Sequence, residues 1–290
     1  MTVRAWAELL RISALFTVPG DALAGAASVG RRPNSSTALA VGASLCLYEA
    51  GMALNDWADR DEDAVDRPHR PIPSGRISPR AALTAAGALT GAGLALAARA
   101  GRPALAVATG LAATVWAYDL RLKHTPAGPA AMAAARGLDL LLGATATGAA
   151  PAPRTARAAL TAAALLSTHT YAVTAVSRHE TQGGSTTAPL AALAAVAGIG
   201  SAVAHEGRAP ARLLPTALTG AYLRTAARPL AHAALNPSPP LTQRAVGSGI
   251  RAMIPLQAAL AARAGAAGSA LAVMGLVPLA RALSRKVSPT

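Results

Sequence analysis

The stretch AALTAAGALTGAGLALAA, residues 81–98, contains no charged side chain, and Thr84 and Thr90 are its only polar side chains. A helix on the surface of a soluble protein needs polar residues that recur every 3.6 positions, and a helix over this stretch would have no polar face. Such a helix is typical of a segment in contact with lipid, where about 20 residues cross the hydrocarbon layer. The stretch therefore predicts a membrane-spanning helix.

The same shortage of charge recurs along the chain. Eight further stretches carry at most one Lys, Arg, Asp or Glu, namely residues 12–20, 36–48, 103–118, 137–153, 158–176, 186–204, 213–223 and 265–279. Much of this apolar content is Ala, and the mean hydropathy of +0.36 is low for a membrane protein. A soluble protein built from buried helices is therefore an alternative, but the lack of polar helix faces favours helices in lipid.

These stretches predict an all-α fold, a multi-pass transmembrane helical bundle of about nine helices. The expected spans lie near residues 9–29, 37–57, 80–99, 103–120, 127–150, 156–176, 186–204, 211–232 and 250–283. Pro19 is expected to break or kink the first span. The last span is too long for one straight crossing, and a division at Gly265 and Gly268 would raise the count. The chain, residues 1–290, is predicted to be a single integral-membrane domain.

The charge of the chain is strongly positive, with 27 Lys and Arg against 13 Asp and Glu and a net charge of +14. A basic balance is a common sign of nucleic-acid binding. Here, however, the cations stand in ones and twos between uncharged runs, as they do at the ends of membrane spans. We therefore expect the lipid bilayer as a partner and no nucleic acid. The single cysteine, Cys46, excludes an intramolecular disulfide and a cysteine-rich metal site.

The orientation in the cell membrane follows from the junctions between spans. With a cytoplasmic N-terminus, the junctions at 58–79, 121–126, 177–185 and 233–249 are cytoplasmic as well. Together with the N-terminal segment they carry more Lys and Arg than the junctions of the opposite face. The positive-inside rule therefore predicts that these junctions face the cytoplasm.

The junction after the second span is the most informative part of the chain, with the sequence NDWADRDEDAVDRPHRPIPSG at residues 55–75. If the helix continues through it, Asp56, Asp59 and Asp63 share one face, at positions i, i+3 and i+7. Carboxylates stacked in this way repel one another unless a cation lies among them. Mg²⁺ is the expected cation because it prefers oxygen ligands and often shares them with phosphates.

Two arginines, Arg67 and Arg70, follow these acids directly, each before a proline. Guanidinium groups match phosphate oxygens in bidentate geometry, so acids for a metal followed by arginines predict a diphosphate site. The alternative is a solvated loop whose charges have no ligand. The regular spacing of the acids and the adjacent arginines favour the site.

The pattern Asn55-Asp56-x-x-Asp59-x-x-x-Asp63, followed by an R-P-x-R-P-I-P-S-G run from Arg67, resembles the first Asp-rich motif of the UbiA superfamily of intramembrane prenyltransferases. The segments 11–25, 118–123 and 136–139 agree with that family in the same order. The resemblance implies a bundle of about nine helices around a central cavity, in which Mg²⁺ and a polyprenyl diphosphate donor bind at cytoplasmic-side loops. The acceptor is unidentified.

The resemblance also implies roles for individual residues. By matching position, the implied metal ligands in the first motif, direct or through water, are Asn55, Asp56, Asp59 and Asp63. The residues implied to bind diphosphate are Arg67, Arg70 and Lys123. The ring of Tyr118 is implied to face the allylic cation.

The second acidic motif of the family is where this chain departs from the pattern. The matching segment is SRHETQGG, residues 177–184, in which Glu180 can replace one carboxylate while Ser177 and Gly184 stand in place of acids. Arg178 would supply positive charge to the diphosphate where a second ion is missing. Glu180 is therefore expected to join the three aspartates as a metal ligand and catalytic group, with one Mg²⁺ and Arg178 in the site. This variant is similar to the UbiA-like branch called EboC.

Two other functions are compatible with the sequence. A non-catalytic relative that binds or transports a lipid or metabolite precursor would explain the weakened second motif. A soluble helical isoprenoid synthase also uses closely spaced aspartates, but the apolar stretches disfavour it. Ionisable residues inside predicted spans face a cavity or a partner because they are costly in lipid, and Arg136 and Asp139 could pair with each other.

Overall fold

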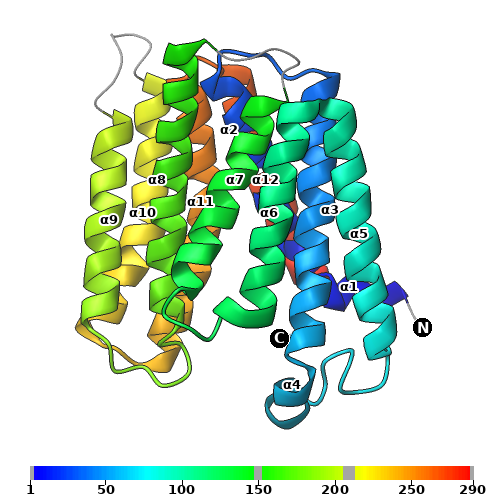
Figure 1. The fold of residues 1–290 in the computed structure, drawn as a ribbon. Coiled ribbons are helices and arrows are strands. Elements are labelled where there is room, and N and C mark those ends of the chain that lie inside the picture. The colour runs from blue at the N-terminus through cyan, green and yellow to red at the C-terminus, as the bar shows by residue number, and fades with distance from the viewer. Residues whose placement is uncertain (1–2, 147–151, 205–212, 288–290) are drawn as a thin grey trace.

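The structure is a computed structural model that describes residues 3–146, 152–204 and 213–287, and its regular elements within these ranges are helices (Figure 1). In chain order they are α1 (Val3–Leu9), η1 (Ile12–Thr17), α2 (Pro19–Ser28), α3 (Ser35–Ala58), α4 (Arg60–Asp66), α5 (Pro79–Ala100), α6 (Arg102–Ala117), η2 (Tyr118–Leu122), α7 (Gly128–Thr145), α8 (Pro153–Ser177), α9 (Thr187–Ala204), α10 (Leu213–Leu235), α11 (Pro239–Arg263) and α12 (Ala267–Val287). Five of them, α3, α5, α8, α9 and α11, are long and apolar enough to cross a membrane. The predicted all-α bundle is confirmed.

Local sequence explains where many helices begin. The side chain of Asn34 accepts a hydrogen bond from the backbone N–H of Thr37 at 3.0 Å and caps α3, and the side chain of Ser78 caps α5. Proline stands in the first turn of α5, α6, α7, α8 and α11, where its missing N–H and fixed φ are compatible with a helix.

The first predicted span is interrupted, as Pro19 indicated. Residues 12–17 form the 3₁₀ helix η1, and α2 begins at Pro19. Arg11, directly before η1, has a left-handed backbone with φ of 48°. This turn separates α1 from the bundle interior, and α2 contacts α3, α7, α8, α11 and α12.

The last predicted span, 250–283, is wrong as a single helix. Gly265, with φ of +82°, separates α11 from α12, which confirms the proposed division. The predicted junction at 233–249 is also wrong in its second half, because α11 begins at Pro239. Ser238 is extended, and the following prolines start the helix although its first turns are polar.

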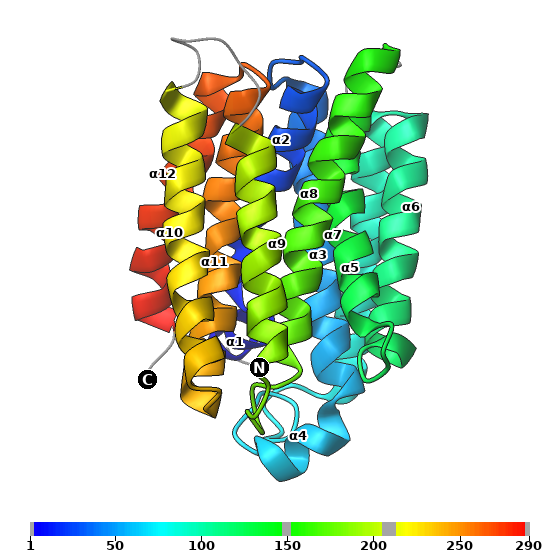
Figure 2. The same ribbon diagram turned by 90° about the vertical axis from the view of Figure 1, so that its left-hand side faces the viewer.

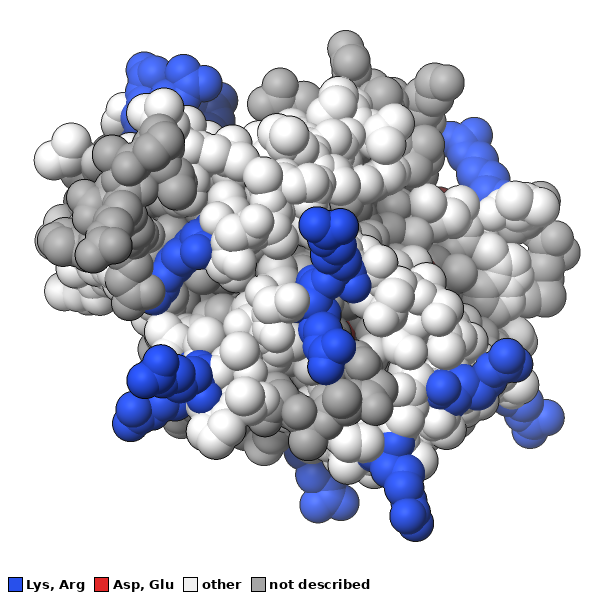
Figure 3. All heavy atoms as spheres, turned by 90° about the horizontal axis from the view of Figure 1, so that it is seen from above, with Lys and Arg blue, Asp and Glu red and all other residues white. Residues whose placement is uncertain are grey.

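Figures 1 and 2 show the long helices running side by side, with α4 and the junctions α6–α7, α8–α9 and α10–α11 at one end, called here the lower end. The predicted grouping of these junctions on one face is therefore observed. Among the described residues, the opposite, upper face is basic: Figure 3 shows blue side chains around it, and the junction at 29–34 carries Arg31 and Arg32 but no acid.

A buried histidine joins the helices of the second half. His169 of α8 is fully buried, with Nδ1 3.0 Å from the hydroxyl of Tyr222 in α10 and Nε2 2.9 Å from the carbonyl oxygen of Gly249 in α11. Both ring nitrogens therefore have partners, as a buried polar side chain requires. His169 links three helices away from the acidic junction.

Candidate functional site

The acidic motif spans the end of α3 and the short helix α4. The helix ends at Ala58, and Asp59 has φ of −88° and ψ of 3°, so the prediction of one continuous helix through Asp63 is wrong. The N–H of Asp63 still donates to the carbonyl oxygen of Asp59 at 2.8 Å, which preserves the spacing of one turn. The bend at Asp59 directs the carboxylates to two different partners.

Asp56 and Asp63 share one cation. Nη1 of Arg70 lies 2.6 Å from Asp63 Oδ2 and 3.5 Å from Asp56 Oδ1, while Arg11 Nη2 lies 3.0 Å from Asp56 Oδ1. Arg67 is 3.5 Å from Asp63. The two carboxylate side chains are only 5% and 2% exposed. The repulsion expected from the sequence is therefore offset by guanidinium groups of the chain itself.

Asp59 faces the segment after α6. Its carboxylate forms an ion pair with Lys123, and His124 Nε2 lies 3.9 Å from Asp59 Oδ1. Asp61, in contrast, has a side chain that is 87% exposed and contacts Arg60. The structure thus brings Asp59 and Lys123 together, while the exposed Asp61 lines the outer part of the same charged hollow without contacting either of them.

Asp119 lies beside Asn55 and Asp59 of the acidic motif, and the sequence reasoning missed it. It lies in η2, a π-helical segment beyond the end of α6, and its Oδ1 accepts a hydrogen bond from Asn55 Nδ2 at 3.1 Å. Asp119 is 4% exposed, so its carboxylate is buried beside Tyr118. Its position between Tyr118 and Lys123, in a segment that carried the family resemblance, was the available signal.

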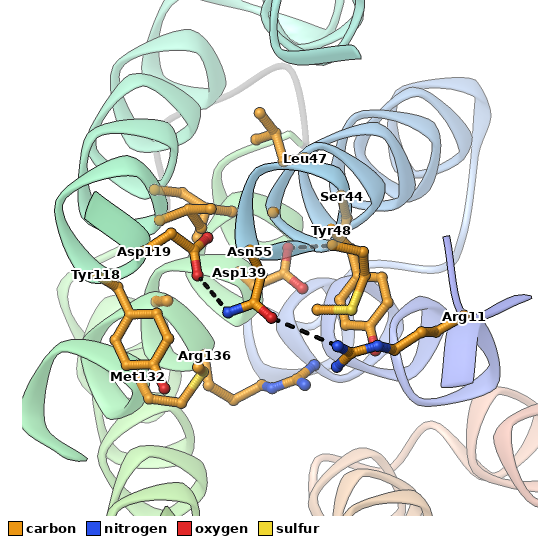
Figure 4. A pocket seen from close by; sticks show the side chains of 15 residues that line it. Arg11, Ser44, Leu47, Tyr48, Asn55, Tyr118, Asp119, Met132, Arg136 and Asp139 are labelled. Atoms are coloured by element: carbon orange, nitrogen blue, oxygen red, sulfur yellow. Dashed lines mark hydrogen bonds between the residues drawn. The ribbon is translucent and has the colours of Figure 1, made fainter. Parts of the chain in front are cut away.

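A cavity of about 220 Å³ opens beside Asn55 and Asp119 and is mostly apolar (Figure 4). The cavity is lined by the residue before η1 and by side chains of α3, α6, η2 and α7. The lining residues are Arg11, Ser44, Leu47, Tyr48, Gly51, Met52, Asn55, Leu111, Val115, Tyr118, Asp119, Met132, Ala135, Arg136 and Asp139. A second hollow of about 410 Å³ is lined by Asp59, Glu62, Lys123 and His124 among others, and also by Asp119. Asp119 therefore lies where an apolar cavity meets a charged one.

The charged side chains at this junction fit a hard divalent cation. Asp59, Glu62 and His124 have ligand atoms within 4.8 Å of one another, and Asp63 Oδ1 is buried with no hydrogen bond and with Arg67 Nη1 at 3.5 Å. Most of the available donors, including the Asn55 amide, are oxygen atoms of the kind that Mg²⁺ prefers. Of the described residues, Asp59 of the predicted first motif therefore lies in a group that could hold a cation, together with Glu62 and His124, which the sequence reasoning missed.

Glu180 and Arg178 lie in the α8–α9 junction at the same end of the bundle, but neither lines the two hollows. Arg178 Nη1 donates to the carbonyl oxygen of Thr125 at 3.0 Å, and the carbonyl oxygen of Glu180 accepts from Gln243 at 3.5 Å. Burial raises the pKa of Glu180. The structure therefore holds this junction beside the α6–α7 turn, and among the described residues Glu180 forms no hydrogen bond or ion pair with the three aspartates.

A second polar network lies beside the apolar cavity, which Ser44, Arg136 and Asp139 also line. Arg136 pairs with Asp21, with 2.6 Å between Nη1 and Oδ2, so the expected direct pair with Asp139 is not the one formed. Asp139 instead accepts a hydrogen bond from Ser44 Oγ at 2.5 Å. Gln257 Nε2 donates to Asp21 Oδ1 at 2.6 Å.

An all-helical bundle of membrane-spanning length, with acidic and basic side chains gathered at the mouth of an apolar cavity, defines a class of integral-membrane proteins with an internal charged site. The chain belongs to the UbiA prenyltransferase family, whose family model matches residues 13–223. The predicted family is therefore confirmed.

Curated relatives match part of the chain. The digeranylgeranylglyceryl phosphate synthase of Methanopyrus kandleri is 38% identical over 129 residues, which cover 43% of this chain and 46% of that protein. The enzyme of the same name from Methanothrix thermoacetophila is 44% identical over 106 residues, 36% of this chain and 40% of that protein. The chain thus spans less than half the length of these relatives.

Solved structures share the fold. The apo structure of a UbiA homolog from Aeropyrum pernix K1 has a TM-score of 0.70 at 19% identity, over 85% of this chain and 96% of that one. A UbiA homolog from Archaeoglobus fulgidus, bound to GPP and Mg²⁺, has a TM-score of 0.64 at 22% identity, over 88% and 99%. The similarity covers the helical bundle.

Proposed function

We propose that this protein is a Mg²⁺-dependent intramembrane prenyltransferase that moves a polyprenyl group from its diphosphate to an acceptor. The position of Asp119 carries the proposal, because this residue lines both the charged hollow and the apolar cavity. A prenyl diphosphate has the same division into a charged head and an apolar tail. The head would bind at the acids while the tail fills the cavity.

Four oxygen-bearing side chains would hold the metal, directly or through water: Asn55, Asp56, Asp59 and Asp63. Bound Mg²⁺ supplies positive charge that stabilises a diphosphate leaving group. Asp119 orients the amide of Asn55 through their hydrogen bond. The A. fulgidus homolog bound to GPP and Mg²⁺ supports the same pairing of metal and donor here.

The cations that neutralise the acids would bind the diphosphate. Arg67, Arg70 and Lys123 each contact a carboxylate of the first motif, so all three lie within reach of a ligand there. Guanidinium groups bind phosphate oxygens in bidentate fashion and stabilise the charge that develops as the allylic C–O bond breaks. The ring of Tyr118, which lines the cavity, would face the allylic cation.

Glu180 and Arg178 are proposed as the residual second motif, with Glu180 as a further metal ligand and Arg178 as a diphosphate contact. The bond from Arg178 to Thr125 holds this junction two residues from Lys123, which supports a role beside the first motif. The sequence supplies one carboxylate there, so we propose a single Mg²⁺ together with Arg178.

The acid cluster is proposed to face the cytoplasm. The lower end carries α4 and the junctions that hold most of the Lys and Arg outside the spans, and the positive-inside rule places such junctions in the cytoplasm. The donor would then enter from the cytoplasmic side of the membrane.

Turnover tests the proposal. The purified protein in detergent is mixed with Mg²⁺, geranyl diphosphate and a panel of hydroxyl and aromatic acceptors, and the released diphosphate is measured. We expect release that requires Mg²⁺ and is lost in Asp59→Ala. Absence of Mg²⁺-dependent binding of any prenyl diphosphate contradicts the proposal.

A second function, a carrier that binds a prenylated or other lipid precursor without turnover, is favoured by one observation. Glu180 and Arg178 lie outside both hollows, and Ser177 and Gly184 replace the acids of a second motif. Mg²⁺-dependent donor binding without diphosphate release, for every acceptor in the panel, would support the carrier.

A further inference from the structure

Two arginines lie at the midpoints of neighbouring long helices, and both side chains are exposed on the outside of the bundle. Arg224 is the middle residue of the 23 in α10, and Arg251 is the middle residue of the 25 in α11. We propose that these two arginines form a docking site for a transmembrane helix of another protein that carries an Asp or Glu near its own midpoint. The site lies on the outer surface of the bundle, and the inference does not depend on the proposed function.

Both arginines lie at the same level, deep in the membrane. The helices α10 and α11 are joined by residues 236–238 and run back against each other, so their midpoints lie side by side (Figure 2). On its other side α10 packs against α9, where a Cβ on Gly200 would lie 2.7 Å from the side chain of Leu223. The 18 residues of α9 contain no charged side chain. Roughly 16–18 Å of helix separates each arginine from each end of its helix, which is at least half of the about 30 Å of hydrocarbon.

These positive charges have no acid beside them. Among the described residues, neither Arg224 nor Arg251 forms an ion pair, and the same holds for the exposed Arg228, one turn toward the lower end of α10. Arg251 Nη2 donates to the hydroxyl of Ser248 at 2.8 Å, a neutral partner. A charged side chain at the centre of the bilayer is costly unless it is paired. A carboxylate supplied from outside the chain would remove that cost.

The surface next to Arg224 admits the close approach of a helix. Ala217 and Gly220 precede Arg224 on the same exposed face of α10, at helical spacing. No atom lies within 4 Å of a Cβ added to Gly220, so the space beside it is open. Helices in lipid associate through packing at small residues and through interhelical hydrogen bonds. The face therefore combines a small-residue surface with an uncompensated charge.

An acidic helix fits this face better than a second copy of the chain or a lipid headgroup. The exposed acids of the described residues are Asp61, Glu62 and Asp66, which lie in α4 at the lower end, so the described part of a second copy presents no carboxylate at this depth. A phospholipid phosphate lies outside the hydrocarbon layer, about 15 Å from its centre. A carboxylate on a spanning helix can lie at the centre itself, where a guanidinium group binds it in bidentate geometry.

Designed membrane peptides test the inference. Two helical peptides of Leu and Ala, about 21 residues long, carry either Glu or Gln at the centre and an acceptor dye at one end. The protein carries a donor dye at Gln182→Cys in a Cys46→Ala background, and energy transfer in phosphatidylcholine vesicles measures the association. We expect the Glu peptide to associate about tenfold more tightly than the Gln peptide, because its pair with arginine is charge-assisted. Equal association of the two peptides overturns the inference.

Variants of the arginines locate the site. Arg224→Leu combined with Arg251→Leu should remove the preference for the Glu peptide. The control combines Arg102→Leu and Arg157→Leu, which remove exposed cations near the upper ends of α6 and α8, and it should keep the preference. A preference that survives in the Arg224 and Arg251 variant contradicts the inference. The wild-type protein with the two peptides is a sufficient test if this variant does not fold.

A change in bulk tests the docking surface without changing its charge. Gly220→Leu should weaken the association of the Glu peptide, because it blocks close approach. Gly198→Leu in α9 is the matched control, since Gly198 is also exposed with no atom within 4 Å of an added Cβ, and it should have no effect. Equal effects of the two substitutions contradict a site on α10.

Vesicles that contain phosphatidylglycerol distinguish a partner helix from a lipid headgroup. We expect the preference for the Glu peptide to persist in these vesicles, because the lipid phosphate lies too far from the midpoint of the helices to compete. Displacement of the Glu peptide by phosphatidylglycerol would assign the two arginines to a lipid headgroup and overturn the inference.

Discussion

Arg70 shows how one residue determines the state of the acid cluster. Its guanidinium group lies between Asp56 and Asp63, while Lys123 neutralises Asp59. The cluster is therefore neutralised by side chains that would themselves bind a diphosphate. Metal and diphosphate would then replace these internal ion pairs together, so we expect the two ligands to bind cooperatively.

The first prediction concerns the individual acids. Asp56→Ala and Asp59→Ala should each weaken Mg²⁺-dependent binding of geranyl diphosphate about tenfold or more, because an incomplete ligand set holds the ion poorly. Asp66→Ala is the control, since Asp66 is exposed at the end of α4 and lines neither hollow. Calorimetry with and without EDTA measures the effect. Equal losses in all three variants would show that the cluster acts only through its net charge.

The second prediction concerns the ion pair between Glu8 of α1 and Arg76. Their atoms lie 2.6 Å (Nη1–Oε2) and 3.0 Å (Nη2–Oε1) apart, and Arg76 lowers the pKa of Glu8 below its ordinary value. A lowered folded-state pKa means that the stabilisation is present above the unfolded pKa and is lost as the pH falls through the folded value.

Glu8→Gln should therefore lower the unfolding temperature slightly at neutral pH and match wild type once the pH is below the folded-state pKa of Glu8. Both side chains are more than a third exposed, so the effect should be less than about 1 kcal/mol. Thermal unfolding of both proteins across this pH range provides the measurement. A difference that persists at the acidic end would assign the effect to packing of α1.

The third prediction concerns the packing of helix α2 against helix α7, which depends on glycines that let the two backbones approach closely. A Cβ at Gly25 would lie 2.8 Å from the nitrogen of Ala144, so Gly25→Ala should destabilise the protein by about 1–3 kcal/mol. At Gly87 of α5 no atom lies within 4 Å of an added Cβ, so Gly87→Ala should be neutral or stabilise by up to about 1 kcal/mol. Thermal unfolding in detergent compares the two, and a similar loss in both would contradict the close contact.

The helices also show how much of the fold the sequence patterns predict. Runs without charge predicted the long helices because lipid-facing segments must lack a polar face, and Pro19 and Gly265 predicted breaks through their backbone chemistry. The start of α11 at Pro239 was missed because its first turns are polar and resemble a loop. Asp119 was missed for a different reason: it joins the cluster only through the fold, which brings η2 against Asn55.

At the scale of the whole molecule, charge is unevenly distributed between the two ends. The described acidic side chains outside the interior lie toward the lower end, where arginines accompany them. On the upper face Figure 3 shows blue side chains, and the described junction at 29–34 carries Arg31 and Arg32 but no acid. The acids of the first motif therefore pair with cations from three segments at one end of the bundle: Arg11 between α1 and η1, Arg70 after α4, and Lys123 after η2. The orientation of the bundle in the membrane therefore determines from which side a ligand can reach the acids of the first motif.

The fourth prediction is that the lower end faces the cytoplasm, because its junctions hold more Lys and Arg. The test uses a Cys46→Ala background, in which Ser35→Cys marks the upper face and Gln182→Cys marks the α8–α9 junction. Both positions are exposed, so a thiol there can react with a reagent in solution. In intact cells a membrane-impermeant maleimide should label Ser35→Cys and not Gln182→Cys, and permeabilised cells should label both. The reverse pattern would place the acid cluster outside the cytoplasm, where a cytoplasmic prenyl diphosphate could not reach it without crossing the bilayer.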